Sequence, residues 1–324
     1  MTICVPTIGS SYLVDALGSA LNQTYAHTEI LVLDNALAPD AQSGLAAFVA
    51  RHPQVRVLRV EERVPMFENF NRGLRAASGT YITYFHDDDR YVPEFLTESV
   101  KFLDEHLEVA LVGSNCRVID QTGRLIRNRA PIKRTGIMPR QTFIAHHMSS
   151  NRNLLPTPGV VFRRDALLAR PFDPRLSVHF GDFVVLMRLA ELGGAGMIAE
   201  PLWSQRIHSG QTTGTGTFSK DAPARLEMMN NYSKEYLERW PDDANLIRSL
   251  RGGLIRSVRI GLVWGWMSAA SDGESAACIG QLSKAGGAPW LAATLDRLDR
   301  LGLTRSRRRA LIPLARAVGA SLRL

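Results

Sequence analysis

The stretch Tyr81-Ile82-Thr83-Tyr84-Phe85-His86-Asp87-Asp88-Asp89-Arg90 decides the fold prediction for this chain. Residues 81–85 are aromatic or β-branched, which predicts a strand that delivers three consecutive carboxylates to a sheet edge. Carboxylates this close repel one another, so a cation or a hydrogen-bond donor is expected beside them. Hard divalent cations prefer oxygen ligands and often combine one or two carboxylates with substrate phosphates. The pattern favours such a metal site over a solvated acidic turn.

Short apolar runs alternate with helical patterns on both sides of this stretch. Strands are predicted at 3–5, 29–33, 55–60, 81–85 and 109–119, and helices at 12–21, 41–50, 67–77 and from Pro93 onward. This alternation predicts an α/β domain with a mostly parallel sheet and helices on both faces. Ligands bind outside the carboxyl ends of the strands in such sheets, so Thr7, Asp34 and residues 87–89 are expected at one edge.

The second half of the chain divides into three parts. Residues 125–180 are irregular and rich in Arg, Asn, Pro and His, as loops over a site often are. A helix is predicted at 182–192, and two short strands at 195–199 and 202–207. The flexible segment 211–217 suggests a boundary, so we expect one domain at 1–215 and an all-helical basic region at 216–324.

Composition and charge exclude several classes of protein. The chain has 324 residues, 45% hydrophobic and 22% charged, which excludes a disordered chain, a collagen and a coiled-coil rod. Its net charge is +8, and residues 220–324 carry 17 Lys/Arg against 10 Asp/Glu. Cys4, Cys116 and Cys278 lie far apart, which predicts buried thiols in a reducing compartment rather than a metal site.

We predict neither a signal peptide nor a membrane span from the sequence. Residues 1–7 lack a basic region followed by an apolar run, and no apolar stretch reaches about 18 residues. The stretches 250–267 and 305–318 mix arginines with apolar residues, a pattern that suits an anionic membrane surface, a solvated helix face or an oligomer contact. We expect a cytoplasmic protein. The alternative is a protein that also contacts the inner face of the membrane peripherally through its basic tail.

Several stretches, in one order, resemble the family-2 glycosyltransferases of GT-A type, which use nucleotide-diphosphate sugars. The resemblance covers residues 1–210 and is most specific over the first hundred. The matching stretches are Val5-Pro6-Thr7, LGSALNQTY at 17–25, Ile30 to Asp34, Asn71-Arg72-Gly73 with the helix to Gly79, Tyr81 to Pro93, Phe172-Asp173, Gly181-Asp182 to Leu189, and Arg206-Ile207-His208.

The resemblance implies a Rossmann-like GT-A domain and a set of site residues. Donor contacts would come from Pro6, Thr7, Asp34, Arg63, Asn71, Asp87 and Asp88. A divalent Mn²⁺ or Mg²⁺ would be held by Asp87, Asp89 and His208, and Asp182 would be the general base. The expected donor is a nucleotide-diphosphate sugar, with a UDP-sugar as the default. The acceptor would be a glycan or a lipid-linked hydroxyl in bacterial surface polysaccharide synthesis.

Three positions depart from the family pattern. His86 stands where an acidic residue is frequent, so metal binding is expected on residues 87–89. Asp34-Asn35-Ala36-Leu37 replaces the usual Asp-Asp-Gly-Ser, and Gly181 replaces the Glu before Asp182. Asp182 is then the sole carboxylate of its motif.

The residues are consistent with an inverting transfer. Sugar transfer passes through an oxocarbenium-like state, for which a carboxylate base on the acceptor side and a Lewis acid on the leaving group suffice. Asp182 opens a helix, where the helix dipole favours its ionised form, although an N-cap without catalytic role has the same pattern. For His208, the sequence is equally consistent with a structural role and with a contact to the metal or the diphosphate.

Other functions account for less of the sequence. A nucleotidyltransferase would need a Gly-rich basic loop after the first strand, which Thr7-Ile8-Gly9-Ser10 is not. A phosphatase nucleophile motif fails because Arg90-Tyr91 follows Asp89. A nucleic-acid-binding protein would use the basic tail but leaves residues 87–89 unexplained, so no nucleic-acid partner is expected. An inactive scaffold that binds a nucleotide sugar remains the main alternative, and the sequence leaves the oligomeric state open.

Overall fold

The structure is a computed structural model that describes most of the chain in detail. The described residues are 1–149, 153–176, 178, 180–210, 218–244, 246–248, 250, 262, 276–280, 292–293 and 295–297. The basic stretch 305–318, most of 250–267 and the predicted boundary between residues 215 and 216 lie outside them.

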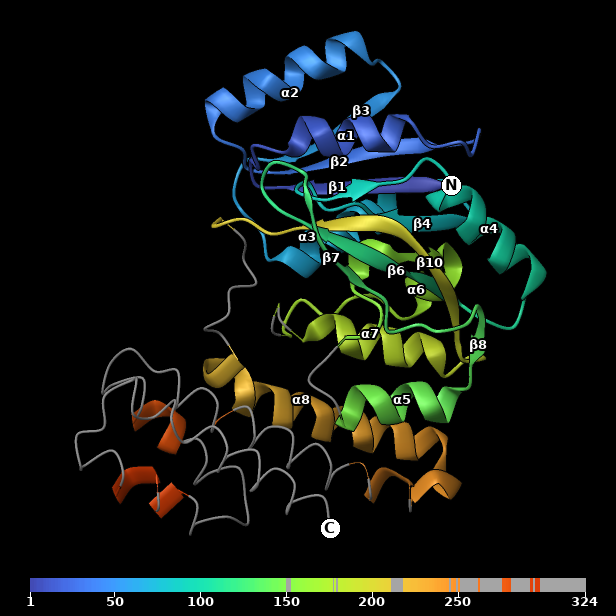
Figure 1. The fold of residues 1–324 in the computed structure, drawn as a ribbon, viewed down its shortest axis with the longest axis vertical. Helices are drawn as coiled ribbons and strands as arrows, with labels where there is room; N and C mark the ends of the chain where they lie inside the picture. Colours follow the sequence, from blue (N-terminus) through green and yellow to red (C-terminus); the bar gives the residue numbers. More distant parts are fainter. Residues whose placement is uncertain are drawn as a thin grey trace. The chain divides into compact units, whose positions relative to one another are not determined.

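Within the described residues, ten strands form one mixed sheet (Figure 1). Its order is β3-β2-β1-β4-β9-β6-β10-β5, with β7 beside β6 and β8 beside β10. The strands are β1 (Thr2–Thr7), β2 (Glu29–Asn35), β3 (Val55–Val60), β4 (Tyr81–Tyr84), β5 (Arg90–Tyr91), β6 (Leu111–Ile119), β7 (Leu125–Arg129), β8 (Gly136–Met138), β9 (Val160–Arg163) and β10 (Ala195–Arg206). The pairs β3/β2, β2/β1, β1/β4 and β6/β10 are parallel.

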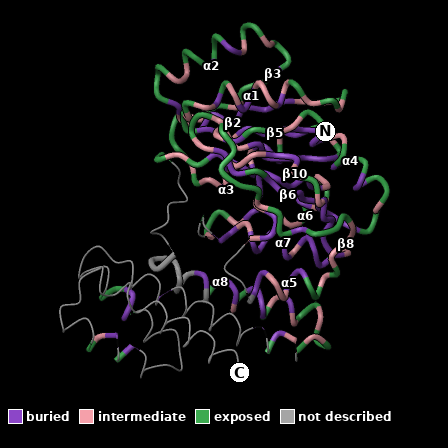
Figure 2. Tube along the Cα trace, viewed as in Figure 1, coloured by how far each residue is buried: buried purple, intermediate pink, exposed green. Residues whose placement is uncertain are grey.

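Helices cover both faces of this sheet because its central strands β1, β2 and β4 are buried on both sides. The helices are α1 (Leu13–Leu21), α2 (Pro39–Arg51), α3 (Met66–Ala76), α4 (Phe95–Glu105), α5 (Arg140–Ser149), α6 (Arg164–Ala169), α7 (Gly181–Ala190) and α8 (Phe218–Arg239), with the 3₁₀ turns η1 (Thr157–Gly159) and η2 (Pro241–Asp243). Ile3 and Val5 belong to the core that α1, α2 and α4 cover. Cys4 between them belongs to the core under α3, α6 and α7, as strand alternation requires. Figure 2 shows the strands buried between these layers.

The predicted α/β fold is confirmed, and the elements predicted in the first 120 residues lie within two residues of their predicted bounds, whereas β5 was not predicted. The three cysteines are buried, as expected. Three predictions were wrong in detail. Pro93 precedes α4, which begins at Phe95. The strands expected at 195–199 and 202–207 are one strand, β10, with register shifts near Pro201. The region 125–180 is not irregular throughout, since its described residues include three strands, two helices and the turn η1.

Strand β9, which the sequence did not predict, positions the region of the site. It pairs antiparallel with both β4 and β6, and Thr83 on β4 lies opposite Val161. The start of β9 therefore lies beside the end of β4, where the three carboxylates follow. Because η1 directly precedes β9, Thr157 is brought to the same edge of the sheet as residues 86–89.

The chain forms two compact units. One consists of Met1–Ile144 and Asn153–Gln211, and the other of Ala145–Arg152 and Thr212–Leu324. The sheet and the candidate site residues belong to the first unit. Among the residues that the structure describes, no helix is long and apolar enough to cross a membrane.

Candidate functional site

The ends of two neighbouring parallel strands bring Thr7 and Asp87 together. Thr7 ends β1, and its Oγ1 donates a hydrogen bond of 2.5 Å to Oδ2 of Asp87, just beyond β4. The same oxygen accepts the Ser10 backbone N–H at 3.4 Å. Burial raises the pKa of Asp87 to about 6, against the lowering effect of the Thr7 hydrogen bond. The predicted meeting of these strand ends at one edge is therefore what the structure shows.

Asp34 lies at the same edge but already has a hydrogen-bonding partner. It is paired in register with Thr7, is 1% exposed, and its Oδ1 accepts the Leu37 backbone N–H at 2.8 Å. This bond closes a tight turn in which Ala36 has a φ of +58°. The left-handed region favours glycine, which is the residue that the family pattern places there.

Replacing Ala36 by Gly is expected to stabilise the protein. Ala36→Gly removes the left-handed penalty of about 1–2 kcal/mol and adds unfolded-state entropy of about 0.5–1 kcal/mol, so the net gain is about 0.5–1 kcal/mol. Urea denaturation measures the change. Ala46→Gly, in the exposed middle of α2, is the matched control and should lose about 1 kcal/mol. Destabilisation by both variants would contradict the strained turn.

Asn35 holds the loop that carries Arg63 against this turn. Its amide bonds both backbone groups of Val64, donating to the carbonyl and accepting the N–H, each at 2.9 Å. Arg63 is exposed beside it. Asn71, by contrast, is buried within α3, and its amide donates to the Phe172 carbonyl at 2.7 Å. The Oδ1 of Asn71 is buried without a hydrogen-bond partner among the described residues, so its role in donor binding stays a prediction.

One cluster of side chains at the end of β4 has the donor set of a metal site. His86, Asp88 and Asp89 each offer a ligand atom, and these atoms lie within 4.8 Å of one another. The Nε2 of His86 is buried without a hydrogen-bond partner among the described residues, and burial lowers the pKa of this imidazole. Burial raises the pKa of Asp89 well above its ordinary value. A neutral imidazole beside two carboxylates fits a divalent cation, because the cation would remove the cost of burying the charges.

This cluster differs from the set predicted by sequence. Asp87 bonds Thr7 and Ser10 and is not part of it, whereas His86, which replaces the usual acidic residue, is. The side chain of His86 lies 6.2 Å, ring to ring, from Phe70, in a T-shaped contact. The signal that could have identified it is its place directly between an apolar strand and the carboxylates.

His208 contacts the cluster from the end of β10. Its Nε2 lies 3.1 Å from Oδ2 of Asp88, and its Nδ1 accepts the Gly210 backbone N–H at 3.2 Å. Because Nδ1 is an acceptor, Nε2 carries the proton and donates to Asp88. In this conformation His208 supports Asp88 and has no lone pair directed at a cation, so direct coordination would require the Gly210 contact to break.

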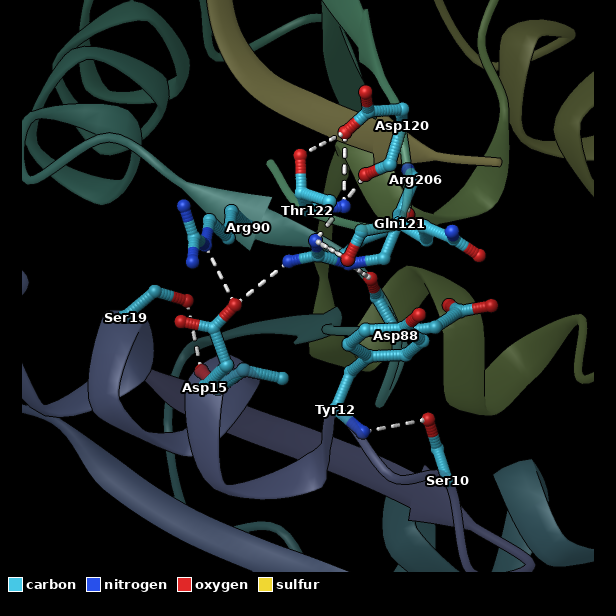
Figure 3. Close-up of polar contacts among 12 residues, drawn as sticks. Ser10, Tyr12, Asp15, Ser19, Asp88, Arg90, Asp120, Gln121, Thr122 and Arg206 are labelled. Atoms are coloured by element: carbon cyan, nitrogen blue, oxygen red, sulfur yellow. Dashed lines mark hydrogen bonds and ion pairs between the residues drawn. The ribbon is translucent and has the colours of Figure 1, made fainter. Parts of the chain in front are cut away.

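Residues 86–89, which follow β4, form a loop that we call the carboxylate loop. Arg206 connects this loop to two other segments (Figure 3). Its backbone N–H donates to Oδ1 of Asp89, and its Nε donates to the backbone carbonyl of Asp88, both at 2.9 Å. Its Nη2 donates to Oδ2 of Asp15 on α1 at 2.6 Å. Its Nη1 lies 3.4 and 3.3 Å from the carbonyls of Asp120 and Gln121 in the β6–β7 turn. The side chain is almost fully buried.

Asp182 lies in the first turn of α7 and is not the residue that caps it, because the helix begins at Gly181. Its Oδ2 accepts hydrogen bonds from Asn153 Nδ2 at 2.7 Å and Thr157 Oγ1 at 3.3 Å. Its Oδ1 is buried without a hydrogen-bond partner among the described residues. Burial raises the pKa of Asp182 to about 7, despite the donors that favour its charged form. Through Thr157 it is held at the edge where the carboxylate loop lies.

Close packing explains why glycine precedes Asp182. A Cβ at Gly181 would lie 2.2 Å from Cε2 of Phe67, whose ring stacks on Phe172 at 5.3 Å. Any larger residue at 181 would displace this aromatic pair. The ring of Phe67 thus fills the space that a side chain at position 181 would need.

Comparison with known proteins identifies the family. The sequence profile described as "Glycosyl transferase family 2" matches residues 2–168, which is more than half of the chain. The chain belongs to glycosyl transferase family 2. An uncharacterized protein of Mycobacterium tuberculosis (strain ATCC 25618 / H37Rv) is 28% identical over 201 residues, which are 61% of this chain and 56% of the relative. The chain thus spans just over half the length of that relative.

Solved structures of glycosyltransferases share the fold. Staphylococcus aureus TarS 1–349, solved in complex with UDP-GlcNAc, has a TM-score of 0.63 at 17% identity, covering 99% of this chain and 88% of that one. A mannosyltransferase from Pyrobaculum calidifontis, in complex with GDP-Man and Mn²⁺, has a TM-score of 0.54 at 17% identity, covering 99% and 85%. These similarities confirm the GT-A architecture of this family-2 chain.

Proposed function

We propose that this protein is an inverting glycosyltransferase that moves a sugar from a nucleotide-diphosphate donor to an acceptor hydroxyl. The observation that carries the proposal is the pairing of two different carboxylate groups at one sheet edge. One group, His86 with Asp88 and Asp89, has the ligand set for a cation. The other, Asp182, is separate and has a pKa of about 7. Sugar transfer needs this division between leaving-group stabilisation and acceptor deprotonation.

The donor would bind along the ends of β1, β2 and β4. Thr7 and the Asp34 turn line up in register there and would face the base and ribose, with Asp87 held by Thr7 beside them. Arg63, which is exposed in the loop that Asn35 holds, would contact a phosphate of the donor. UDP is the default nucleotide, since the TarS complex holds UDP-GlcNAc, although the P. calidifontis enzyme was solved with GDP-Man.

Residues His86, Asp88 and Asp89 would hold a divalent cation, Mn²⁺ or Mg²⁺. When bound, such an ion supplies Lewis-acid stabilisation of the departing diphosphate. His208 donates from Nε2 to Asp88 and so keeps that carboxylate oriented. Thr7 and the Ser10 N–H do the same for Asp87. The P. calidifontis structure with Mn²⁺ supports the choice of metal class.

Asp182 would act as the general base. Asn153 and Thr157 occupy its Oδ2, so Oδ1, which has no partner among the described residues, is the atom left to accept the acceptor's proton. A pKa of about 7 suits proton removal near neutral pH. With one base and no carboxylate nucleophile assigned, the proposed transfer inverts the configuration at the anomeric carbon.

The acceptor is proposed to be a glycan or a lipid-linked saccharide in surface polysaccharide synthesis. An Escherichia coli relative named chondroitin synthase, 30% identical over 129 residues, supports a polysaccharide product. It aligns with 40% of this chain and 19% of its own length. The domain division at residue 215 and the membrane contact of the basic tail belong to this proposal.

Calorimetric titration with UDP, GDP and dTDP, each with and without Mn²⁺, tests the donor site. We expect one nucleotide to bind with a Kd in the micromolar range, and the affinity to fall at least about tenfold when EDTA replaces Mn²⁺. Binding of none of the three by a folded sample would contradict the proposal. Binding without any release of nucleotide from the matching sugar donors would favour an inactive scaffold.

A further inference from the structure

The guanidinium of Arg206 forms an ion pair with Asp15, and its charge also acts on Asp89, whose ionised form it favours. Its Nε contacts the backbone carbonyl of Asp88, a neutral group, and its contact with Asp89 is made by the backbone N–H. Its Nη2 lies 2.6 Å from the Asp15 carboxylate. The ring of Tyr12 covers the guanidinium, with 4.4 Å from Cζ to the ring centroid.

Without this arrangement, Arg206 would compete with a metal ion. A buried guanidinium beside Asp88 and Asp89 could form ion pairs with them, and it would then take the place that a divalent cation needs. Asp15 prevents this by supplying the opposite charge from α1, on the other side of the guanidinium. Asp15 also bonds Arg90 Nε at 2.6 Å, but Arg90 is exposed and is dispensable for this role.

We propose that Asp15 is a positioning residue for the metal site. It neutralises Arg206, so that Arg206 can fix the carboxylate loop through its backbone while the carboxylates of Asp88 and Asp89 stay available to a cation. This inference rests on the proposed metal-dependent function. It assigns a role to a residue on α1 that touches neither the metal cluster nor the expected donor.

Direct Mn²⁺ binding tests this role without an activity assay. Free Mn²⁺ is measured by electron paramagnetic resonance while wild-type protein, Asp15→Asn and Arg90→Gln are titrated, and thermal unfolding in EDTA reports folding. We expect Asp15→Asn to weaken Mn²⁺ binding about tenfold, the effect of one uncompensated charge nearby. Arg90→Gln removes the exposed partner of Asp15 and should stay within about twofold of wild type.

A double variant separates charge from structural damage. In Asp15→Asn/Arg206→Met the competing cation is gone, so Mn²⁺ affinity should recover at least about threefold relative to Asp15→Asn. If Asp15→Asn does not fold, the double variant is compared with wild type. A loss of Mn²⁺ affinity of more than about hundredfold then overturns the proposed role of Asp15. Unchanged binding in a folded Asp15→Asn, or weaker binding in the double variant, also overturns it. Absence of Mn²⁺ binding by wild type would instead refute the metal site itself.

Discussion

Asp182→Asn should reduce release of nucleotide from the sugar donor about a thousandfold and leave Mn²⁺-dependent nucleotide binding unchanged. The amide keeps the hydrogen bond from Asn153 but cannot take a proton from the acceptor hydroxyl. Loss of a general base typically costs about 10²–10⁴-fold in rate. The donor identified by calorimetry, with water or an added saccharide as acceptor, provides the assay.

A pH profile distinguishes a base from a structural residue. Because the base must be ionised, wild-type kcat/KM should rise with pH through about 7, the pKa of Asp182, rather than near the ordinary value of 3.8. Asp165→Asn, an exposed carboxylate on α6, is the control and should keep the wild-type profile. Normal release by Asp182→Asn would show that another group is the base.

The same residue should make the protein less stable at high pH. The folded-state pKa of Asp182 is raised above its unfolded value, so the native state binds more protons between about pH 4 and 7. Its contribution is therefore favourable at low pH and is lost as pH rises through about 7. Asp182→Asn should accordingly be more stable than wild type at pH 8, by about 1–3 kcal/mol, in urea denaturation.

Asp88→Asn is expected to abolish metal-dependent donor binding. The variant keeps the shape of the side chain and can accept the hydrogen bond from His208, but it removes one of the two carboxylates in the cluster. Loss of a ligand should weaken Mn²⁺-dependent nucleotide binding at least about 100-fold, since even supporting residues cost 10–100-fold. Titration calorimetry at fixed Mn²⁺ measures the loss.

Asp165→Asn again serves as the control, because it removes one negative charge from the same domain far outside the cluster in sequence. It should bind nucleotide and Mn²⁺ as wild type does. Equal weakening in both variants would mean that net charge matters and that Asp88 is no ligand. Thermal unfolding in EDTA confirms that each variant is folded.

Sequence reasoning worked best where a local pattern determines the outcome. The stretch 81–90 combines β-forming residues with carboxylates, and the structure places it at a strand end beside Thr7, as expected. Strand alternation and helical spacing likewise located every element of the first 120 residues except the two-residue strand β5. These features depend on residues near one another in the chain, so the sequence alone carries them.

The rest depends on contacts between distant residues. Strand β9 is four residues long, and its position is determined by pairing with β4 and β6. No local sequence pattern predicts this pairing. Arg206 meets Asp15 across 191 positions, and Asn153 meets Asp182 across 29. The group with the donor set for a metal includes His86 and not Asp87, which bonds Thr7 through a contact that requires the folded sheet.

The central claim is that donor and metal bind at the carboxyl ends of β1 and β4. A crystal structure of the protein with UDP and Mn²⁺, with the anomalous signal of manganese, tests it most directly. The account predicts an anomalous peak in coordinating contact with Asp88 and Asp89 and with the diphosphate, and a nucleotide beside Thr7. A manganese peak away from Asp88 and Asp89, with the nucleotide bound elsewhere, would contradict the account.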